Sequence, residues 1–439
     1  MLTLALCLAA SQPIAPVDVV HREGDWLKLA ARVQRPVRAL PAEKPKMAAY
    51  LKSLYQKAAV RHSFVLHTGD EVDCVDVARQ PALRRAELKG HRIQKAPPPP
   101  RAPAIIGNRA AQPFTRAARA VAIDALVRAG KDAKGRERKC PAGSIPIRKT
   151  ALADLHAFPS MSDVFARLPQ SARRGSRDGH QYAHASRGGL RNYGAISRLN
   201  VWNPAVSHDG IEFSLSQIWV TAGSGNREQT LEAGVQVLPS KYGDRRARLF
   251  IYSTSDGYAA ERNQDFSRAN GCYNLDCSRF IQVDGSIVIG APFAAYSVTG
   301  GAQREIEIGW FRGPGGWWLW VGGHWVGYYP TELFSALKHH ATGVDFGGEI
   351  VDDRSAHRAH TTTNMGSGHF PRAGFGKAAF QRRLGYFPSP DAPAWTALSG
   401  LDASRTDAKC YDIGDVVEGD PDWGTWFFFG GTGYSRLCK

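Results

Sequence analysis

The sequence lacks the short motifs that mark several large enzyme classes. It has no G-x-S-x-G nucleophile elbow, no P-loop and no dinucleotide-binding glycine fingerprint, which argues against α/β serine hydrolases, NTPases and nicotinamide enzymes. Its histidine pairs, His339-His340 and His357-x-x-His360, lack the H-E-x-x-H spacing of zinc peptidases. We therefore expect these histidines in solvated loops, and we expect no metal and no cofactor.

Cysteine is scarce, with seven residues in 439. Cys7 lies in an apolar N-terminal stretch, and the even number that remains suits disulfides in an oxidising compartment. The C-x4-C pair Cys272 and Cys277 has no second Cys/His pair at ligand spacing, which favours a disulfide-closed loop over a zinc site. Spacing alone leaves the full pairing open.

Acidic residues are scarce only in the first part of the chain. Residues 1–175 hold 31 Lys and Arg against 14 Asp and Glu, whereas the rest holds 25 against 26, within a net charge of +16. The near-neutral C-terminal part offers no broad field for phosphates, so we expect no nucleic-acid partner. We expect the basic part to lie over an acidic cleft at neutral pH and to loosen as the acids protonate.

Long apolar runs are absent beyond the N-terminus, so we expect no membrane span. Residues 1–15 are apolar and small, which predicts a secretory signal although its basic n-region is missing. The protein is therefore expected to be secreted to the extracellular space.

The pattern of apolar residues changes near residue 179. Apolar residues at helical spacing predict helices over 41–60 and 114–129, on either side of the stiff run Pro97–Pro100. We expect residues 41–165 to form a small, helix-containing α+β domain. Residues 179–439 are expected to form a second domain.

Residues 166–178 have the composition of an exposed, cleavable linker between these two domains. The linker contains Pro169, Arg173 and Arg174, and we expect a protease to cut it at one of these residues.

Short strand-like runs, punctuated by Gly, Pro, Asn and Asp, dominate the second domain. Many short strands with few helical patterns predict a mainly β fold, an antiparallel β-sandwich of two stacked sheets that is jelly-roll-like. The expected strands are 211–220, 231–238, 249–253, 280–283, 287–289, 305–311, 317–321 and 324–328.

Two glutamates stand out among these runs. The run Leu231–Leu238 alternates so that Glu232 and Gln236 share one strand face, which we expect to be solvated, opposite an apolar face. Glu349 follows Gly347-Gly348, where glycines allow close approach of backbone or substrate. Two carboxyl groups can hydrolyse an amide if one activates water and the other donates a proton.

Other acids in strand-like sequence are weaker candidates. We expect Glu305, Glu307 and Glu332 to be ordinary surface or rim residues. A free glutamate has a pKa of about 4.3, so a carboxyl pair that shares one proton favours activity in acid.

Several segments together resemble one known family, the neprosin family of glutamic endopeptidases. The segments, in order, are LEAGVQVLPSKYGD, STSDGY, GCYNLDC, VGYYPTELF, FGGEIVD and NMGSGHFPRAGFGKAAF. Upstream, DEVDCVDVARQPAL, GHRIQ and CPAGSIPIRKT resemble the activation peptide of that family, and CYDI with DWGTWFFFGG resembles its closing segment. The resemblance spans residues 65 to 438.

The resemblance implies a secreted zymogen that cuts proline-containing proteins after proline and is inhibited by its own propeptide. It implies that Glu232 and Glu349 are catalytic, and it supports the disulfides Cys74–Cys140, Cys272–Cys277 and Cys410–Cys438. Val235 stands where plant members usually have tryptophan, so the substrate pocket differs in shape. We expect a monomer.

Five polar and aromatic residues are expected to bind substrate amides or a proline ring. They are Gln217, Gln236, Tyr252, Trp219 and Tyr328.

Two other classes stay open from the sequence. Lectins and glycosidases also combine aromatic strips with carboxylates on β-sandwiches, and an inactive binding module would carry the same fold. Incubating the acidified protein with a proline-containing peptide and with glycans would separate these possibilities.

Overall fold

The computed structural model describes residues 37–56, 59–100, 119–120, 130–165, 179–207, 211–258, 269–353, 359–392 and 394–439. The expected signal (1–15) and the expected linker (166–178), with Pro169, Arg173 and Arg174, lie outside these residues. Most of the helix expected over 114–129 also lies outside them. Its residues Arg119–Ala120 instead form strand β3, because they pair with the end of another strand and tertiary pairing outweighs the local pattern.

The N-terminal part combines short helices with a small antiparallel sheet. The sheet has the order β1–β2–β4 and is tied by the disulfide Cys74–Cys140, whose Cα atoms are 5.4 Å apart. The helix expected over 41–60 is present as α2, which buries Met47 and Leu54 against the C-terminal helices of this part. The elements are α2 (Lys44–Gln56), β1 (Val60–Val65), β2 (Glu71–Asp76), β4 (Ser144–Arg148), α3 (Leu152–His156) and α4 (Met161–Phe165), with 3-10 turns at Val77–Arg79, Pro81–Arg84 and Ala86–Leu88.

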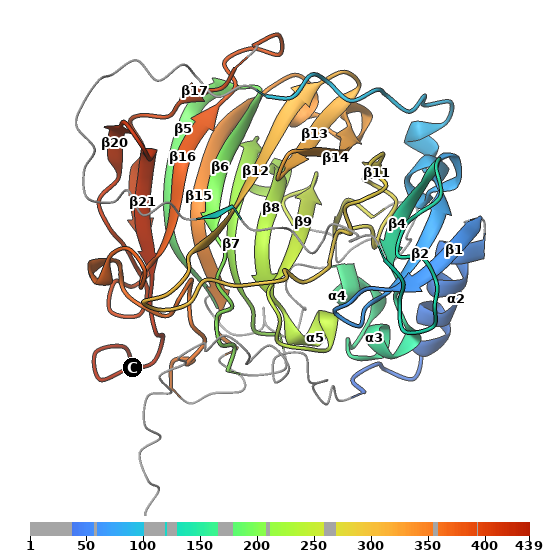
Figure 1. Ribbon diagram of the computed structural model, residues 1–439, viewed down its shortest axis with the longest axis horizontal. Helices are drawn as coiled ribbons and strands as arrows, with labels where there is room; N and C mark the ends of the chain where they lie inside the picture. The colour runs from blue at the N-terminus through green and yellow to red at the C-terminus, as the bar shows by residue number, and fades with distance from the viewer. Residues whose placement is uncertain are drawn as a thin grey trace, which may run out of the picture.

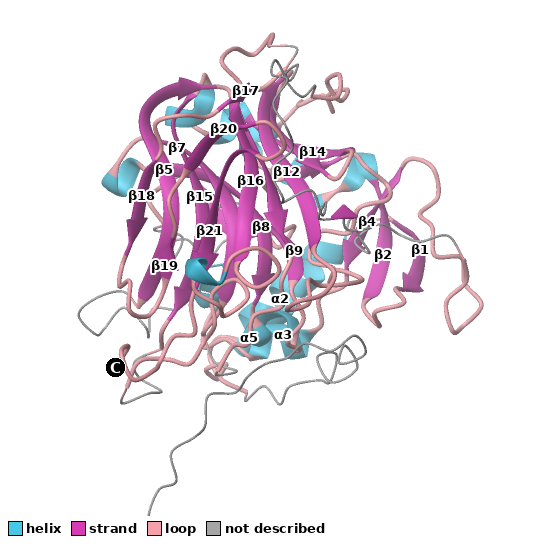
Figure 2. Cartoon of the chain, turned by 60° about the vertical axis from the view of Figure 1, so that its left-hand side comes forward, coloured by secondary structure: helices cyan, strands magenta, loops and turns pink. Residues whose placement is uncertain are grey.

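The rest of the chain forms two large sheets (Figures 1 and 2). The first has seven antiparallel strands in the order β10–β9–β8–β7–β15–β5–β18. Its strands are β5 (His180–Asn192), β7 (Ser214–Ala222), β8 (Gln229–Val237), β9 (Arg248–Thr254), β10 (Gly271–Tyr273), β15 (Ala341–Val351) and β18 (Asp402–Arg405). Chain neighbours do not always pair, since β15 enters between β7 and β5.

The second sheet has eleven strands, eight of them in the order β11–β14–β13–β12–β6–β16–β21–β19. These are β6 (Gly194–Asn200), β11 (Ile281–Gln282), β12 (Arg304–Gly313), β13 (Gly316–Val321), β14 (His324–Pro330), β16 (Ala379–Tyr386), β19 (Asp412–Ile413) and β21 (Gly424–Gly430). The remaining three pair at its margins: β3 with β12, β17 (Thr396–Ala397) with β16, and β20 (Val417–Asp420) with β21. The helix α5 (Pro239–Tyr242) and 3-10 turns at Gly225–Arg227, Thr331–Leu333, Ala336–Lys338 and Pro371–Ala373 complete the connections.

The sheets stack into the expected mainly β sandwich, and strand β6 packs on β7 and β15. Their facing sides form one apolar core that includes Leu231, Val235 and Ile308. The strand expected at 287–289 is absent, because the Asp284 carboxylate accepts hydrogen bonds from the amides of Ser286 and Ile287 and turns the backbone. Apolar residues there still enter the core, which explains the misleading pattern.

All six remaining cysteines are paired as the resemblance implied. Besides Cys74–Cys140, the disulfides are Cys272–Cys277 and Cys410–Cys438. No helix within the described ranges is both long and apolar enough to cross a bilayer.

The N-terminal part packs beside β9 and β11, at the right of Figure 1. Helix α4 contacts β10, and α3 contacts α5. Gln80 reaches strand β11, where its amide nitrogen donates to the Gln282 carbonyl (3.0 Å) and its oxygen accepts from the Gln282 amide (2.8 Å). A side chain thus pairs with the sheet edge much as a neighbouring strand would.

A buried charge cluster joins the two parts. Asp70 accepts hydrogen bonds from Arg248 (2.9 Å) and Arg246 (3.2 Å) of the sandwich and from Arg148 (3.0 Å) of its own part. Asp244 neutralises the same two sandwich arginines at 2.6 Å. Burial alone would raise the pKa of Asp70, but the charges of Arg248, Arg148 and Arg246 outweigh it and hold that pKa well below its usual range.

The charges at this contact do not follow the composition of the two parts. Each part supplies one acid, Asp70 or Asp244, and the near-neutral sandwich supplies two of the three bases. The net charge of a segment does not determine which of its residues become buried, and the expected arrangement of basic residues over the glutamates stays a prediction.

Candidate active site

Glu232 and Glu349 lie on the same face of the seven-stranded sheet, which points away from the inter-sheet core. Within Leu231–Val237 the odd-numbered residues enter the core, so Glu232 and Gln236 point to the other face, as the alternation predicts. That face is not solvated as expected, since both side chains are fully buried. Aromatic residues pack on it, including Trp219 and Tyr252.

Within the described residues, Glu232 accepts hydrogen bonds from three side chains. Its Oε2 accepts a hydrogen bond from Gln217 Nε2 (3.0 Å), and its Oε1 accepts from Thr230 Oγ1 (2.9 Å) and from the Tyr258 hydroxyl (2.8 Å). Such a set of donors orients a carboxyl group and suits its ionised form, which only accepts hydrogen bonds.

Glu349 lies on β15, where the glycines before it allow close strand packing. A Cβ atom at Gly347 would lie 2.4 Å from the Ala183 carbonyl oxygen of β5, so the backbone approach expected from the Gly-Gly pair is present. The Glu349 carboxylate is fully buried and pairs with Nδ1 of His180, also from β5. His180 therefore orients the Glu349 carboxyl group.

The strand register places the two glutamates two cross-strand rows apart. Glu349 lies opposite Leu215, whereas Glu232 lies opposite Trp219 on the same strand, β7. This offset is about 13 Å along the strands and about 10 Å across them. Gln217 lies in the row between the two glutamates. The two carboxyl groups can act on one substrate bond only if their side chains lean toward each other across that row.

Gln217 and its neighbour Gly347 are fixed from the core side by a buried amide. Nε2 of Gln381, on β16 of the other sheet, lies 3.1 Å from the Gln217 carbonyl and 3.3 Å from the Gly347 carbonyl. Ser197 holds the other end of this amide by donating to its Oε1 (3.1 Å). The row between the glutamates is therefore anchored through the sandwich.

A His–Asp pair lies next to the glutamates. His184 Nδ1 contacts both carboxylate oxygens of Asp345, at 2.8 and 2.7 Å, and Asp345 lies in the same row as Trp219. Burial would lower the pKa of His184, but the hydrogen bond and charge of Asp345, with the charge of Glu349, raise it. Burial raises the pKa of Asp345 above its usual value despite the opposing effect of His184.

The other expected binding residues on this sheet line the same face. Tyr252 lies opposite Glu232 and packs against Tyr273, with ring centroids 4.9 Å apart. Gln236 donates to the Tyr273 hydroxyl (3.3 Å). Within the described part of the chain, Oε1 of Gln217 and of Gln236 are buried without a hydrogen-bond partner. Such acceptors can receive the N–H groups of a bound peptide.

Comparison with known families now adds to this geometry. The neprosin family model matches residues 210–432, and the model of the neprosin activation peptide matches residues 63–186. This chain belongs to the neprosin family. Membership indicates peptidase activity and a zymogen with an activation peptide. Among solved structures, CG-16, a homodimeric agglutinin from chicken liver, matches with 9% identity and a TM-score of 0.21, covering 38% of this chain and 93% of its own.

In this neprosin-family chain, Tyr328 is not part of the glutamate face. It lies on β14 of the other sheet, stacked on Trp318 at 4.6 Å between ring centroids. Its hydroxyl accepts a hydrogen bond from the Gln94 amide (3.0 Å) and lies 2.8 Å from His91 Nε2. Tyr328 therefore lies away from the glutamates, because the sequence does not tell which sheet a strand joins, and its binding of substrate stays a prediction.

Glu305 and His360 also differ from expectation. Glu305 is buried, not a surface residue, because Arg382 binds both of its oxygens (2.7 and 2.6 Å). His360 is buried rather than solvated, with Nδ1 2.9 Å from the Thr361 carbonyl, and His357 lies outside the described residues. Glu332 is half-exposed as expected and lies 3.3 Å from His91.

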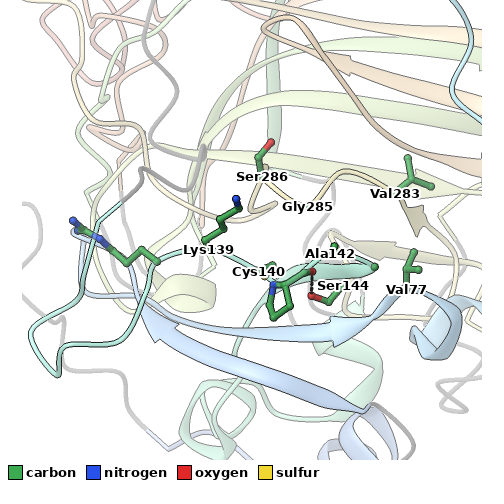
Figure 3. Close-up of a pocket in the computed structure, with 11 residues that line it drawn as sticks. Val77, Lys139, Cys140, Ala142, Ser144, Val283, Gly285 and Ser286 are labelled. Atoms are coloured by element: carbon green, nitrogen blue, oxygen red, sulfur yellow. Dashed lines mark hydrogen bonds between the residues drawn. The ribbon is translucent and has the colours of Figure 1, made fainter.

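A hollow of about 520 Å³ between the N-terminal part and the sandwich carries no catalytic pair. Figure 3 shows its lining, in which Ser144 Oγ donates to the Pro141 carbonyl (2.6 Å) and Lys139 and Ser286 lie around the opening. Among the described residues no carboxyl group lines it, so it cannot supply the carboxyl pair that the proposed chemistry needs.

Three direct partners of the glutamates were not expected from the sequence, and neither was the neighbouring pair of His184 and Asp345. Thr230 could have been found, because period two places it on the same strand face as Glu232. Tyr258 follows β9, and His180 begins β5, so both reach the glutamates through long-range packing that a local pattern does not show.

Proposed function

We propose that the chain is the secreted zymogen of a glutamic endopeptidase that hydrolyses proteins on the carboxyl side of proline, most actively in acid, as a monomer. The observation that carries the proposal is the arrangement of Glu232 and Glu349 on one face of one sheet, each buried and oriented by hydrogen-bond partners. Buried carboxyl groups among polar and aromatic side chains are typical of acid–base catalysis.

The proposed reaction uses one carboxylate as base and the other carboxyl group as acid. The base takes a proton from water, and the water oxygen forms a bond to the scissile carbonyl carbon. The tetrahedral intermediate then collapses, the C–N bond breaks, and the acid donates its proton to the leaving amine. Gln217 and Gln236 would hold the peptide backbone, and Trp219 and Tyr252 would contact a proline ring.

The burial of the glutamates bears on latency. Both glutamates are inaccessible in the full-length chain, so a protein substrate reaches them only after the chain rearranges. We propose that residues 41–165 inhibit the peptidase domain, residues 179–439. A cut in the linker, at Pro169 by the enzyme itself or at Arg173 or Arg174 by another protease, would then release the inhibition.

The test compares Glu232→Gln and Glu349→Gln with a control, Glu332→Gln, on the exposed 3-10 turn after β14. General acid–base catalysis contributes about 10²- to 10⁴-fold, so each of the first two variants should lose at least that much cleavage of a proline-containing peptide near pH 3, while the control stays active. Retention of more than about a tenth of the rate by either folded variant would remove that residue from the mechanism. Hydrolysis of glycans instead of peptide would favour a glycosidase.

A further inference from the structure

The outer face of the eleven-stranded sheet carries a row of aromatic side chains. Phe311, Trp318 and Tyr328 lie in one cross-strand row on β12, β13 and β14. Trp325 lies beside this row, with its ring centroid 6.0 Å from that of Phe311, and Phe387 packs edge-on against Phe311 at 4.7 Å. Because Ile308 and Trp310 of β12 enter the core, this row faces the opposite side, away from the glutamates.

The N-terminal part lays a proline run over these aromatics. The Trp325 indole donates to the Pro98 carbonyl at 3.3 Å, and His91 and Gln94 bind the Tyr328 hydroxyl just upstream. Beside this contact, a cavity of about 730 Å³ is lined by Pro97–Pro100 on one side and by residues of the sheet on the other. We call its sheet side the outer aromatic groove, formed by Tyr193, Phe311, Trp325, Phe387 and Pro390.

The chemistry of this contact is that of polyproline II recognition. Consecutive prolines are held in an extended helix whose carbonyls point outward and whose N–H groups are absent, so they cannot add to a sheet ladder. Aromatic grooves bind such segments through ring contacts and donors to the prolyl carbonyls, at low entropic cost because the helix is preformed. Trp325 supplies both a ring and a donor.

We propose that the outer aromatic groove is an exosite that binds polyproline II segments of protein substrates once the activation peptide has left. This inference rests on the proposed function for the departure of that peptide and for the nature of the substrates. Because the groove and the glutamates lie on opposite outer faces of the sandwich, a protein with several proline-rich segments can occupy both. Tethering by one segment raises the effective concentration of the next at the cleft.

The first experiment measures binding without catalysis. In full-length chain carrying Glu232→Gln, replacing Pro97, Pro98, Pro99 and Pro100 by serine should vacate the groove. A fluorescein-labelled peptide of sequence APPPPR, which matches residues 96–101, should then bind at least tenfold more tightly than to the chain that retains its prolines. A labelled ASSSSR peptide should not bind.

Matched tryptophan variants locate the site. Adding Trp325→Ala to the vacated chain should weaken APPPPR binding at least tenfold, whereas Trp426→Ala, a partly buried tryptophan on β21, should leave it unchanged. Equal binding by the Trp325→Ala chain, or no binding by the folded vacated chain, would overturn the proposal.

A second measurement applies if the serine variant does not fold. Trp325→Ala in the otherwise unchanged chain should speed tryptic cleavage after Lys95, next to the proline run, several-fold relative to Trp426→Ala. Equal rates would count against the groove. Binding of APPPPR by a chain with no peptidase activity would retain the groove and reject the proposed function, whereas peptidase activity without APPPPR binding would do the reverse.

Discussion

Asp70→Asn removes the one negative charge that the N-terminal part contributes to the buried cluster with Arg246 and Arg248, and it preserves the shape of the side chain. Breaking a buried ion pair from one side costs about 3–5 kcal/mol. Asp244 still neutralises both arginines, so we expect the lower end, about 3 kcal/mol, or roughly a 10²-fold weaker docking equilibrium.

Hydrogen exchange at the Gln282 amide reports docking without using activity. That N–H donates to Gln80 across the contact, so its protection should fall roughly 10²-fold in Asp70→Asn. The control is Glu71→Gln, an equal charge change one residue along β2, whose partner Lys149 is about half-exposed and whose pair is worth about 0–1 kcal/mol. Equal protection in the two variants, both folded, would refute the assignment of docking strength to Asp70.

The pH dependence of this difference has a definite sign. A carboxyl whose folded pKa is depressed contributes stability that is present above its unfolded pKa, 3.8, and is lost as pH falls through the lower folded value. The difference in Gln282 amide protection between Asp70→Asn and Glu71→Gln should therefore be constant from pH 7 to pH 5 and should disappear only below pH 3.8. If acid opens the zymogen at milder pH, groups other than Asp70 must respond.

Two further predictions concern the glutamate face. Because the pKa of His184 is raised in the folded state, this residue contributes stability that is fully present below its unfolded pKa of 6.5 and is lost as pH rises through the folded pKa. The raised pKa of Asp345 likewise makes the fold more stable in acid. The melting temperature should therefore fall with rising pH more steeply in the native chain than in His184→Gln, and parallel melting curves would reject this. Gly234→Ala should displace Gln217, whose Cβ would lie 2.6 Å from the new methyl, and should destabilise the chain by about 1–3 kcal/mol in chemical denaturation. The control is Gly188→Ala on β5, where the new methyl meets open space and stability should not change. Equal midpoints for the two glycine variants would show that the strands adjust freely.

Local patterns predicted the parts of the site that depend on one strand. The alternation in Leu231–Val237 predicts which side chains enter the core, and the two glycines before Glu349 predict the close approach of a neighbouring backbone, which is that of β5. Period two and steric permission are properties of a few consecutive residues, so they can be read without the fold.

What could not be predicted depends on strand order and register. β15 enters the sheet between β7 and β5, far from its chain neighbours, and only this brings His180 to Glu349. Tyr328 lies in a strand-like sequence run, as Tyr252 does, yet its strand joins the other sheet. At 287–289 the apolar run predicts a strand, but a single carboxylate, Asp284, fixes a turn there, and the local pattern does not show this.

The short length of β11 has a consequence for the released enzyme. This strand lies at the margin of its sheet, and Gln80 occupies its outer backbone groups while the N-terminal part is attached. Departure of Gln80 uncovers an edge, and unpaired edges recruit strands from other molecules and promote aggregation. With only Ile281–Gln282 in strand conformation, the edge that the proposed removal of the N-terminal part would uncover is short, which disfavours such pairing.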